Sequence, residues 1–401
     1  MSEHSLLLET PPRGWTAGSF GDVCIRVQDA ASPTPNGQRL YLGLEHLASG
    51  FPSLVGRGWE SEVRSGKTAF RKGDVLFGKL RPYLRKSVLV SEDGICSTDI
   101  LVFRTSEKSL PEFLCLLTHS DEFAGHAKAT TSGVQHPRTS WASLREFKLH
   151  VPPLAEQRKI AGVLGVVQRA LEQQERLIAL TTELKKVLLY QLFTQGLRGE
   201  PQKQTEIGPV PQSWEVVTIG DLFKFSSGKS RPDDTELTAS ESRPFPVFGG
   251  NGVLGYSSRY LVEEPLLLIG RVGEYCGCAH HTAGRAWVSD NALYAKEILR
   301  ETNTRYAAEY FSYANLNQYR NQAGQPLITQ GVISKVRMPL PPIDQQREIL
   351  EPLTLLNQKL SVSKRKHAAL TALFRTLLHQ LMTAQIRVDK LDIEELNVGI
   401  S

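Results

Sequence analysis

The sequence is poor in cysteine and contains no long apolar run. Its 401 residues include only 5 cysteines, an odd number that suits a reducing compartment and argues against a disulfide framework. A membrane helix needs about 18 consecutive apolar residues, and no segment approaches that length. The N-terminal residues also lack the basic start and apolar core of a signal peptide. We therefore expect a cytoplasmic protein that has no contact with a membrane.

A strong excess of one charge is absent as well. Lysine and arginine number 47 against 42 aspartates and glutamates, a formal net charge of +5, which by itself does not indicate a nucleic-acid partner. The chain is 40% hydrophobic and 22% charged, values typical of a globular protein with real cores. Its length suits two or three domains. The distribution of the charge must therefore carry more information than its sum.

Motifs for catalysis and metal binding are also missing. The stretch "SGKS" (227–230) lacks the first glycine of a phosphate-binding loop, because Phe223 stands there. In "CGCAHH" (276–281), the cysteines and histidines stand too close together for the usual zinc-ligand spacing. "PDDTE" (232–236) lacks the Glu-x-Lys of a metal-dependent nuclease, and neither an Asn-Pro-Pro-aromatic motif for adenine methylation nor a loop suited to S-adenosylmethionine is found. We expect a recognition protein that is not an enzyme and needs no metal or cofactor of its own.

The sequence does contain a long internal repeat. "VPPLAEQRKI" (151–160) returns 189 positions later as "LPPIDQQREI" (340–349), and the match continues without a gap into the segments that follow. In both copies, apolar positions alternate by steps of four and three, over residues 160–192 and 349–381. This heptad pattern predicts two amphipathic helices, each roughly 60 Å long at about 1.5 Å per residue.

Two helices with the same pattern can pair with each other as an antiparallel coiled coil. The alternative is that each helix packs only on its own domain. The proline pairs fit just before a helix start, and Gly196 is suited to end the first helix. Pro352 falls inside the second pattern, so we expect a kink or a late helix start there.

A second repeat lies outside the first. A tryptophan followed by Gly-Asp occurs at 15–22 and again at 214–221. The stretch "VLFGKL" (75–80) has a weaker counterpart in "LLIGRV" (267–272), at an offset of 192 positions. Short apolar runs of this kind between turn residues predict strands. The chain therefore consists of a globular segment and a helix, followed by a second globular segment and a second helix.

Each globular segment also has a helical pattern, at 110–128 and at 305–323. The predicted fold class is α/β (mixed α and β), with two similar globular domains separated by two long helices that form an antiparallel coiled coil, and with an internal pseudo-two-fold repeat. The predicted boundaries are 1–150 for the first globular domain, 151–198 for the first helical region, 199–211 for a linker, 212–340 for the second globular domain, 341–390 for the second helical region and 391–401 for a tail.

This organisation resembles the specificity subunit of type I restriction–modification systems. The resemblance rests on "PPLAEQRKIAGVL" (152–164), "PPIDQQREIL" (341–350), the leucine-rich helices after them, and "TEIGPVPQSWEVVTIGDL" (205–222). It implies two target-recognition domains, each of which reads one half of a bipartite, asymmetric DNA sequence. The helical regions would set the distance between the halves and dock methyltransferase subunits. One departure from the family pattern is Gln345, which stands where the first copy has Glu156.

The resemblance also implies the partners. These are double-stranded DNA, two methyltransferase (modification) subunits and restriction subunits that translocate and cleave DNA. S-adenosylmethionine, and ATP and Mg²⁺ where a nuclease subunit is present, would be used by those partners. The alternative is an interaction scaffold, in which the coiled coil joins two protein-binding modules. The candidate docking residues, at the starts of the two helices, are Gln157, Arg158, Gln346 and Arg347.

Candidate DNA contacts in the first domain come from a basic stretch and a polar loop. The stretch "KTAFRKGDVLFGKLRPYLRKS" (67–87) has seven cations against one acid, a density that suits phosphate contacts, although a solvated basic face is the alternative. Tyr83 within it can stack on a base or pack internally. The polar loop is "TSGVQHPR" (131–138). The candidates are Lys67, Arg71, Lys72, Lys79, Arg81, Arg85, Lys86, Gln135, His136 and Arg138.

Candidates in the second domain lie on glycine-rich loops, where the backbone can approach a phosphate closely. Asparagine can pair with adenine, although an asparagine between glycines also suits a turn. Arg271 stands at the position that matches Lys79 of the first domain. The candidates are Lys229, Arg231, Asn251, Tyr256, Arg259, Arg271 and Gln325.

Overall fold

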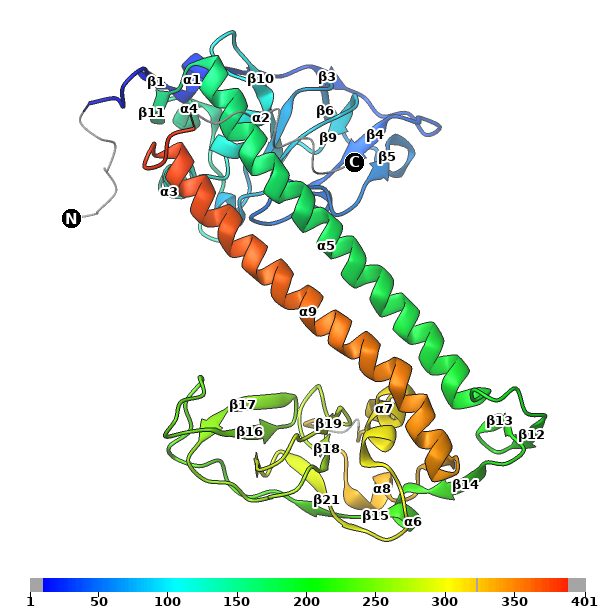
Figure 1. The fold of residues 1–401 in the computed structure, drawn as a ribbon. Coiled ribbons are helices and arrows are strands. Elements are labelled where there is room, and N and C mark those ends of the chain that lie inside the picture. The colour runs from blue at the N-terminus through cyan, green and yellow to red at the C-terminus, as the bar shows by residue number, and fades with distance from the viewer. Residues whose placement is uncertain (1–9, 322–323, 389–401) are drawn as a thin grey trace. The chain divides into compact units, whose positions relative to one another are not determined.

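The computed structural model describes residues 10–321 and 324–388. The chain divides into two compact units, Met1–Glu175 together with Lys366–Ser401, and Arg176–Arg365. Figure 1 shows the elements in chain order. Because both divisions fall within long helices, each unit combines a globular segment with part of each long helix. The predicted tail, 391–401, lies outside the described residues.

The first unit contains two sheets and a two-stranded ribbon. One sheet is antiparallel, with the order β2-β10-β7-β8, formed by Cys24–Val27, Ile100–Thr105, Val75–Gly78 and Ser87–Leu89. In the other, β4 and β9 are parallel, and the order β3-β6-β9-β4-β5 is formed by Ala30–Ala31, Lys67–Phe70, Gly94–Cys96, Leu40–Leu42 and Gly58–Trp59. The ribbon pairs β1 (Thr16–Ser19) with β11 (Lys148–Val151). The helices are α1 (Phe20–Val23), α2 (Pro111–Leu117), α3 (Asp121–Ala129) and α4 (Trp141–Leu144).

The core of the first unit is rich in aromatic rings. The ring centroid of Phe20 in α1 lies 5.2 Å from that of Phe103 in β10 and 4.7 Å from that of Phe123 in α3. Burial of such rings removes large apolar surfaces from water and stabilises the fold. The helix predicted over 110–128 is divided into α2 and α3. The division occurs because the Ser120 hydroxyl accepts a hydrogen bond from Phe123 N at 3.2 Å and so starts a new helix.

The second unit repeats this plan. Its antiparallel sheet has the order β15-β21-β18-β19, formed by Phe223–Ser227, Ala292–Ile298, Leu267–Gly270 and Ala279–His281. In its other sheet, β16 and β20 are parallel, and the order β17-β16-β20 is formed by Gly252–Ser257, Phe245–Gly249 and Trp287–Val288. The ribbon pairs β14 (Glu215–Thr218) with β22 (Arg337–Leu340). The helices are α6 (Ile219–Leu222), α7 (Thr304–Ala314) and α8 (Gln330–Ile333).

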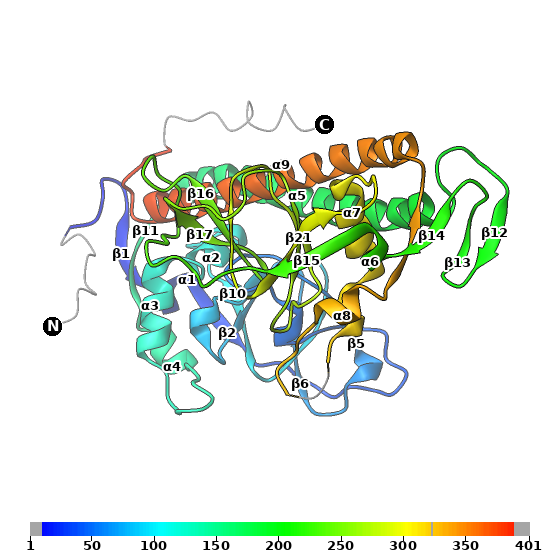
Figure 2. The same cartoon turned by 90° about the horizontal axis from the view of Figure 1, so that it is seen from below.

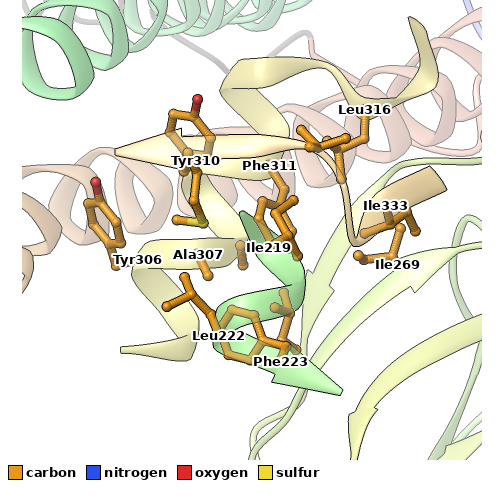
Figure 3. Packing of buried hydrophobic residues seen from close by; sticks show 14 of the residues in the cluster. Ile219, Leu222, Phe223, Ile269, Tyr306, Ala307, Tyr310, Phe311, Leu316 and Ile333 are labelled. Carbon is orange, nitrogen blue, oxygen red and sulfur yellow. The ribbon is translucent and has the colours of Figure 1, made fainter. Parts of the chain in front are cut away.

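The core of the second unit forms where α6 and β15 meet α7. Figure 3 shows Leu222 and Phe223 beside the buried side chains of α7, among them Tyr306 and Phe311. The helix predicted over 305–323 is shorter than expected, because α7 ends at Ala314 and a 3-10 helix follows. Residues 322–323 of that prediction lie outside the described residues.

The segment predicted as a linker, 199–211, contains a β-hairpin. Its strands are β12 (Gln202–Thr205) and β13 (Gly208–Pro211), which pair in antiparallel fashion. Figure 2 shows this hairpin next to β14. The polar composition that favoured a linker thus also allows a short ribbon between α5 and the second globular segment.

The two long helices are α5 (Leu154–Thr194) and α9 (Ile343–Met382), as the heptads predicted. Gly196, with a φ of 66°, follows the end of α5, in the role expected of it. By contrast, α9 starts at its first predicted residues and continues through Pro352, so the late start is wrong, whereas the alternative of a kink stays a prediction. The proline removes one backbone hydrogen bond. The neighbouring Leu353 is completely buried, and this packing compensates for the lost bond.

Helices α5 and α9 pack against each other in both units, with apolar residues of the two helices in one buried cluster in each case. In the first unit, His367 Nε2 of α9 lies 3.0 Å from Glu175 Oε1 of α5. In the second unit, Lys185 Nζ of α5 donates to Asn357 Oδ1 of α9 at 2.7 Å. Residue numbers rise along α5 where they fall along α9, so the predicted antiparallel coiled coil is confirmed. Within the described ranges, no helix is both long and apolar enough to cross a membrane.

Candidate nucleic-acid interface

A buried tryptophan joins each globular segment to the start of a long helix. Trp15 Nε1 donates to Glu156 Oε2 at 2.9 Å in the first unit. Trp214 Nε1 donates to Gln345 Oε1 at 2.7 Å in the second unit. The two acceptors are 189 positions apart, the offset of the helical repeat. The Gly-Asp that follows each tryptophan lies in the short helix after the first strand. These matching contacts fix the orientation of each globular segment on its helix.

A buried glutamine at each helix start strengthens this attachment. Gln157 Nε2 donates to the carbonyls of Lys108 and Pro152, both at 2.8 Å, and Gln157 Oε1 accepts from Leu110 N at 2.9 Å. Gln346 makes matching bonds, in which its Nε2 and its Oε1 each bond one backbone group at 2.8 Å. All these partners belong to the same unit as the glutamine.

This burial bears on the predicted docking residues. Gln157 is 0% exposed and Gln346 is 1% exposed, so the prediction that these side chains dock a partner is contradicted by their internal bonds. Their neighbours Arg158 and Arg347 are exposed at the same two helix starts. The arginines therefore stay candidates, since they alone of the four side chains reach the surface.

An arginine beyond the end of each long helix binds the start of the other helix. Arg387 Nε and Nη2 donate to the two carboxylate oxygens of Glu156 at 2.7 and 3.0 Å. Arg198, 189 positions earlier, donates to Asp344 and Glu348, with 2.7 Å contacts to both carboxylates. The position that matches Glu156 is a glutamine in the second unit, so this arginine pairs with acids on either side of it.

In the first unit, two loops bring candidate DNA-binding residues together. One joins β7 to β8 (79–86), and the other lies between α3 and α4 (130–140). Arg81 N donates to Pro137 O at 2.8 Å, and Thr139 N donates to Lys79 O at 3.1 Å. We call these two segments the first loop pair. It contains the predicted residues Lys79, Arg81, Arg85, Lys86, Gln135, His136 and Arg138.

An acid lies among these cations. Asp99 accepts hydrogen bonds from Arg138 Nε and Nη2 at 2.9 and 3.2 Å. These bonds, and then the charges of Arg138, Lys79 and His136, lower the pKa of Asp99. Asp99 is therefore ionised at neutral pH, holds the Arg138 guanidinium in one orientation and offsets its charge.

Two arginines of the first loop pair have a left-handed backbone. Arg81 has a φ of 50° and Arg85 a φ of 48°, a conformation that costs about 1–2 kcal/mol for a residue with a Cβ. The second unit has Gly273 and Gly277 at the matching positions, with φ of 89° and 88°. Strain of this kind concentrates at functional sites. Arg85 binds Asp121 at 2.6 Å, whereas Arg81 is exposed, so Arg81 is the arginine placed to meet a ligand.

The other cations of the basic stretch are in different environments. Lys67 is buried in β6, and its Nζ donates to Ser65 O and Oγ at 2.7 and 2.6 Å. The prediction that Lys67 contacts DNA is therefore contradicted, because strand pairing draws this residue into the sheet. Lys86 Nζ donates to a backbone carbonyl at 2.6 Å. Arg71 and Lys72 are exposed and stay candidates for phosphate contacts.

In the second unit, the loop between β18 and β19 (271–278) makes the same contacts with the loop before α8 (320–329). Gly273 N donates to Pro326 O at 2.9 Å, and Ile328 N donates to Arg271 O at 2.9 Å. We call these two segments the second loop pair, of which residues 322–323 lie outside the described residues.

The side chains of the two loop pairs differ although the backbone bonds match. Asn291 replaces Asp99, and its carbonyl accepts from Arg271 N at 2.8 Å as the Asp99 carbonyl accepts from Lys79 N at 2.9 Å. Gln325 stands where the first unit has a histidine. The two surfaces thus offer different hydrogen-bonding groups on one backbone design.

Three further candidates in the second unit line one hollow. Lys229, Arg231 and Arg259 line it together with Trp287 and the acids Asp233 and Asp290. The guanidinium of Arg259 lies 5.9 Å from the Trp287 ring centroid and 3.8 Å from the carboxylate of Asp234. Cations beside an aromatic ring are typical of nucleic-acid-binding surfaces.

The remaining two candidates belong to the β16–β17 hairpin. Asn251 is exposed at its turn, before Gly252 with a φ of 102°, so the turn interpretation of this asparagine is confirmed. Tyr256 is half-buried in β17, and its backbone exchanges two hydrogen bonds with Glu236, at 2.7 and 2.9 Å. Of the two, Asn251 has the more accessible side chain.

The cysteine- and histidine-rich segment at 276–281 is part of the packed fold of the second unit. Cys276 is buried, burial raises the pKa of its thiol, and Asn317 Nδ2 donates to its carbonyl at 2.7 Å. The two histidines lie in β19. Among residues 10–321 and 324–388, no three His, Cys, Asp or Glu side chains are grouped closely enough to hold a metal ion.

The chain matches one family over both of its halves. Residues 12–182 and 211–372 match the family described as Type I restriction modification DNA specificity domain. The chain belongs to this family. Each matched region contains one globular segment and most of the long helix after it, as the resemblance in the sequence predicted.

Two relatives are named as specificity subunits, and one solved structure shares the fold. The putative type I restriction enzyme MjaX specificity subunit of Methanocaldococcus jannaschii is 21% identical over 404 residues, which cover 94% of this chain and 95% of that protein. The EcoprrI specificity subunit of Escherichia coli is 29% identical over 154 residues, 37% of this chain and 38% of that protein. The crystal structure of the type I S subunit from M. genitalium shares the fold, with a TM-score of 0.67 at 17% identity over 95% of this chain and 99% of that chain. The predicted role in DNA sequence specificity within a type I restriction–modification complex is confirmed.

Four residues of the candidate interface were not predicted from the sequence. They are the acid Asp99, the amide Asn291 and the aromatic residues Tyr275 and Trp287. The offset of 192 positions that aligns "VLFGKL" with "LLIGRV" also aligns Asp99 with Asn291, and Tyr83 with Tyr275. The repeat therefore held a signal for three of the four. Trp287 aligns with Ile95, so the repeat gave no signal for it.

Proposed function

We propose that this chain selects a bipartite, asymmetric DNA site for a type I restriction–modification complex. The observation that carries the proposal is the pair of matching loop pairs, which share backbone hydrogen bonds but present different side chains. Backbone contacts set the position of a protein on DNA, whereas side chains distinguish base edges. One backbone design with two sets of side chains therefore suits two half-sites of different sequence.

In this proposal, each loop pair contacts one half-site. Arg81 is exposed on a strained backbone, and its forked guanidinium suits the O6 and N7 acceptors of guanine. Arg71 and Lys72, exposed between β6 and β7, supply phosphate contacts. In the second half, Arg271 takes the position that matches Lys79, and Gln325, Asn251, Lys229, Arg231 and Arg259 complete the surface.

Chemistry in the complex belongs to partners in this proposal. Two methyltransferase subunits use S-adenosylmethionine to methylate adenine, and restriction subunits use ATP and Mg²⁺. The exposed Arg158 and Arg347, one at each helix start, give the methyltransferase subunits two equivalent docking points. The chain itself is then a non-catalytic recognition subunit. Its place is the cytoplasm, where chromosomal DNA of a prokaryotic cell lies.

Mapping of methylated adenines tests the proposal. The chain is produced with its companion methyltransferase in a host that lacks adenine methylation, and modified adenines are read across the genome. We expect a split motif with two different halves and a fixed gap. If both proteins are folded and associated but no split motif is modified, the proposal is wrong, and binding of other proteins by the two units becomes the question.

A variant assigns the first loop pair to one half-site. Arg81→Ala should relax one position of a single half and lower the affinity for the site by about 1–3 kcal/mol. The matched control is Arg57→Ala, because Arg57 is an exposed arginine of the same unit that lies outside the loop pair and pairs with Glu92 at 3.4 Å. A change in both halves from Arg81→Ala would contradict the assignment.

A further inference from the structure

One residue is the same in both loop pairs and yet is exposed in both. Tyr83 follows β7 and Tyr275 follows β18, and the two are 192 positions apart, the offset that aligns the two sheets. Their side chains are 47% and 57% exposed. Around them the residues differ, since the position before the tyrosine is Pro82 in one loop and Glu274 in the other.

The backbone holds both tyrosines in the same turn. Leu84 N donates to Arg81 O at 2.9 Å, and the matching Cys276 N donates to Gly273 O at 3.0 Å. At the base of each loop, a glycine N–H at the end of β7 or β18 bonds the carbonyl eight residues on, at 2.8 Å in both units. The two rings therefore start from equivalent positions on equivalent loops.

Neither tyrosine has a visible role inside its own unit. Within residues 10–321 and 324–388, neither hydroxyl has a hydrogen-bond partner, and neither ring lies against another ring or a cation. The exposed Tyr260 is different, because its hydroxyl donates to Glu263 at 2.9 Å and its ring lies 4.9 Å from the Arg285 guanidinium. Packing thus explains Tyr260 but does not explain the identity of Tyr83 and Tyr275.

A residue shared by two surfaces that bind different sequences must contact something that both half-sites have in common. Every base presents a π face, so an aromatic ring can stack on any of them. A methyltransferase must also take its target base out of the duplex stack, which leaves a neighbouring base without its stacking partner. Each loop also contains cations, Lys79 and Arg81 in one and Arg271 in the other, and these favour DNA over a protein as the ligand.

We propose that Tyr83 and Tyr275 are equivalent base-stacking residues, each of which places its ring against a base exposed when the target adenine of its own half-site leaves the stack. This inference rests on the proposed function. It assigns to each loop a contact that does not depend on sequence, next to the side chains that do. The hydroxyl is not needed for stacking, so phenylalanine can replace tyrosine at both positions.

The test uses the full chain in complex with its companion methyltransferase. Two duplexes carry the mapped split site, with 2-aminopurine in place of the target adenine of either the first or the second half-site, and fluorescence at saturating protein reports the unstacked base. Tyr83→Ala should lower the signal of one probe roughly tenfold and leave the other probe unchanged. Tyr275→Ala should do the reverse, so each variant is the matched control for the other. Tyr83→Phe and Tyr275→Phe should behave like the unchanged chain.

A mismatched version of each duplex separates a loss of stacking from a structural effect of the substitution. A mismatch opposite the target base makes unstacking easier, so it should restore most of the signal that the alanine variants lose. Alanine variants that give full signals on both probes, or a mismatch that restores nothing, would overturn the inference. Loss of methyltransferase from the purified variant complex would show that the tyrosine docks protein instead. An unchanged complex that fails to bind the mapped site would contradict the proposed function itself.

Discussion

In the first unit, Gln157 is buried at the start of α5 and bonds three backbone groups, and in the second unit Gln346 is buried at the start of α9 with matching bonds. On the loops, Arg81 of the first unit faces solvent where the second unit has Gly273. The two units therefore keep the residues that hold a globular segment on its helix and change residues on the exposed loops. Tyr83, which is both kept and exposed, fits neither group and indicates a shared ligand.

The units also differ in how they contact the long helices away from the helix starts. In the first, the ring of Phe51 lies 5.0 Å from the ring of Phe374 in α9. In the second, Glu309 of α7 binds Lys185 of α5 at 3.1 Å and accepts from Asn357 of α9 at 2.7 Å. One contact is apolar and the other ionic. The residue types at the helix starts are therefore more restricted than those further along the helices, where either an apolar or an ionic contact attaches the globular segment.

The largest effect is expected at the glutamines. Gln157→Leu leaves the carbonyls of Pro152 and Lys108 and the N–H of Leu110 without a partner, the first in a buried bond and the other two in part-buried bonds. A fully buried group costs about 1–3 kcal/mol and a part-buried group less, so the unit should lose roughly 3–5 kcal/mol. Gln346→Leu should have a comparable effect in the second unit. Hydrogen exchange of α2 and α7 measures each unit separately. Arg158→Ala, at the exposed neighbour, is the control, and an effect in one unit alone would break the comparison.

Acid should weaken the first unit through His119. Burial lowers the pKa of His119 to about 4, whereas the unfolded side chain titrates near about 6.5. Between these values the unfolded chain binds a proton that the folded chain does not, so stability falls as the pH drops through this window, by about 2–3 kcal/mol. Burial also lowers the pKa of His280 and of His281 in the second unit, but both are only half-buried, so each should contribute less than His119.

Exchange experiments between pH 7 and pH 4 follow this difference. The variant His119→Gln should give a flatter pH dependence in the first unit, because its side chain cannot bind the proton. The same slope with and without His119 would assign the acid sensitivity to other groups.

The acid and the amide at the helix starts should not be interchangeable. Glu156→Gln removes the ion pair with Arg387, and Gln345→Glu places a carboxylate beside Glu200, which Gln345 Nε2 now bonds at 3.1 Å. Each change should cost about 2 kcal/mol. The second loss should be reversed when Glu200→Gln is added. If neither single change altered the stability, the acid of one unit and the amide of the other would be interchangeable at this position.

The smallest effect is a gain in stability. Arg81→Gly removes a left-handed residue with a Cβ and should stabilise the first unit by up to about 1 kcal/mol. It should also reduce DNA binding. Arg85→Gly is the matched comparison, since it relieves the same strain but loses the bonds to His119 O and Asp121, so no gain is expected. Thermal unfolding of both variants measures the difference, and an equal gain in both would show that those bonds contribute nothing.

Much of the fold was predictable because the pattern repeats. The heptads placed both long helices, and the apolar runs placed β7 and β18. Pro352 favoured a late helix start that is wrong, since the rule for proline considers one lost hydrogen bond and cannot include the burial of Leu353 beside it. The helix break at Ser120 was also not predictable. A serine starts a helix only where the chain turns before it, and that turn depends on tertiary contacts.

Less of the interface was predictable, because the charge of a residue does not indicate whether its side chain is buried. Lys67 counted as a basic residue although β6 carries it into the sheet. Arg138 was a candidate DNA contact in a polar loop, although Asp99, 39 residues away, binds it. The stretches "KLRPYLRKS" and "RVGEYCGCA" share only Tyr83 and Tyr275, so their correspondence is weak in the sequence and becomes clear from the matching strand orders of the two sheets.

The two units also differ in how the chain supplies them. The second unit is one continuous stretch, Arg176–Arg365. The first consists of two segments that are far apart in the sequence, Met1–Glu175 and Lys366–Ser401. On the ribosome, where chains emerge from the N-terminus, the part made first is thus completed last, when Phe374 and Arg387 reach their partners. A premature stop after residue 365 would therefore damage the unit whose globular segment is already fully translated and leave the later one whole.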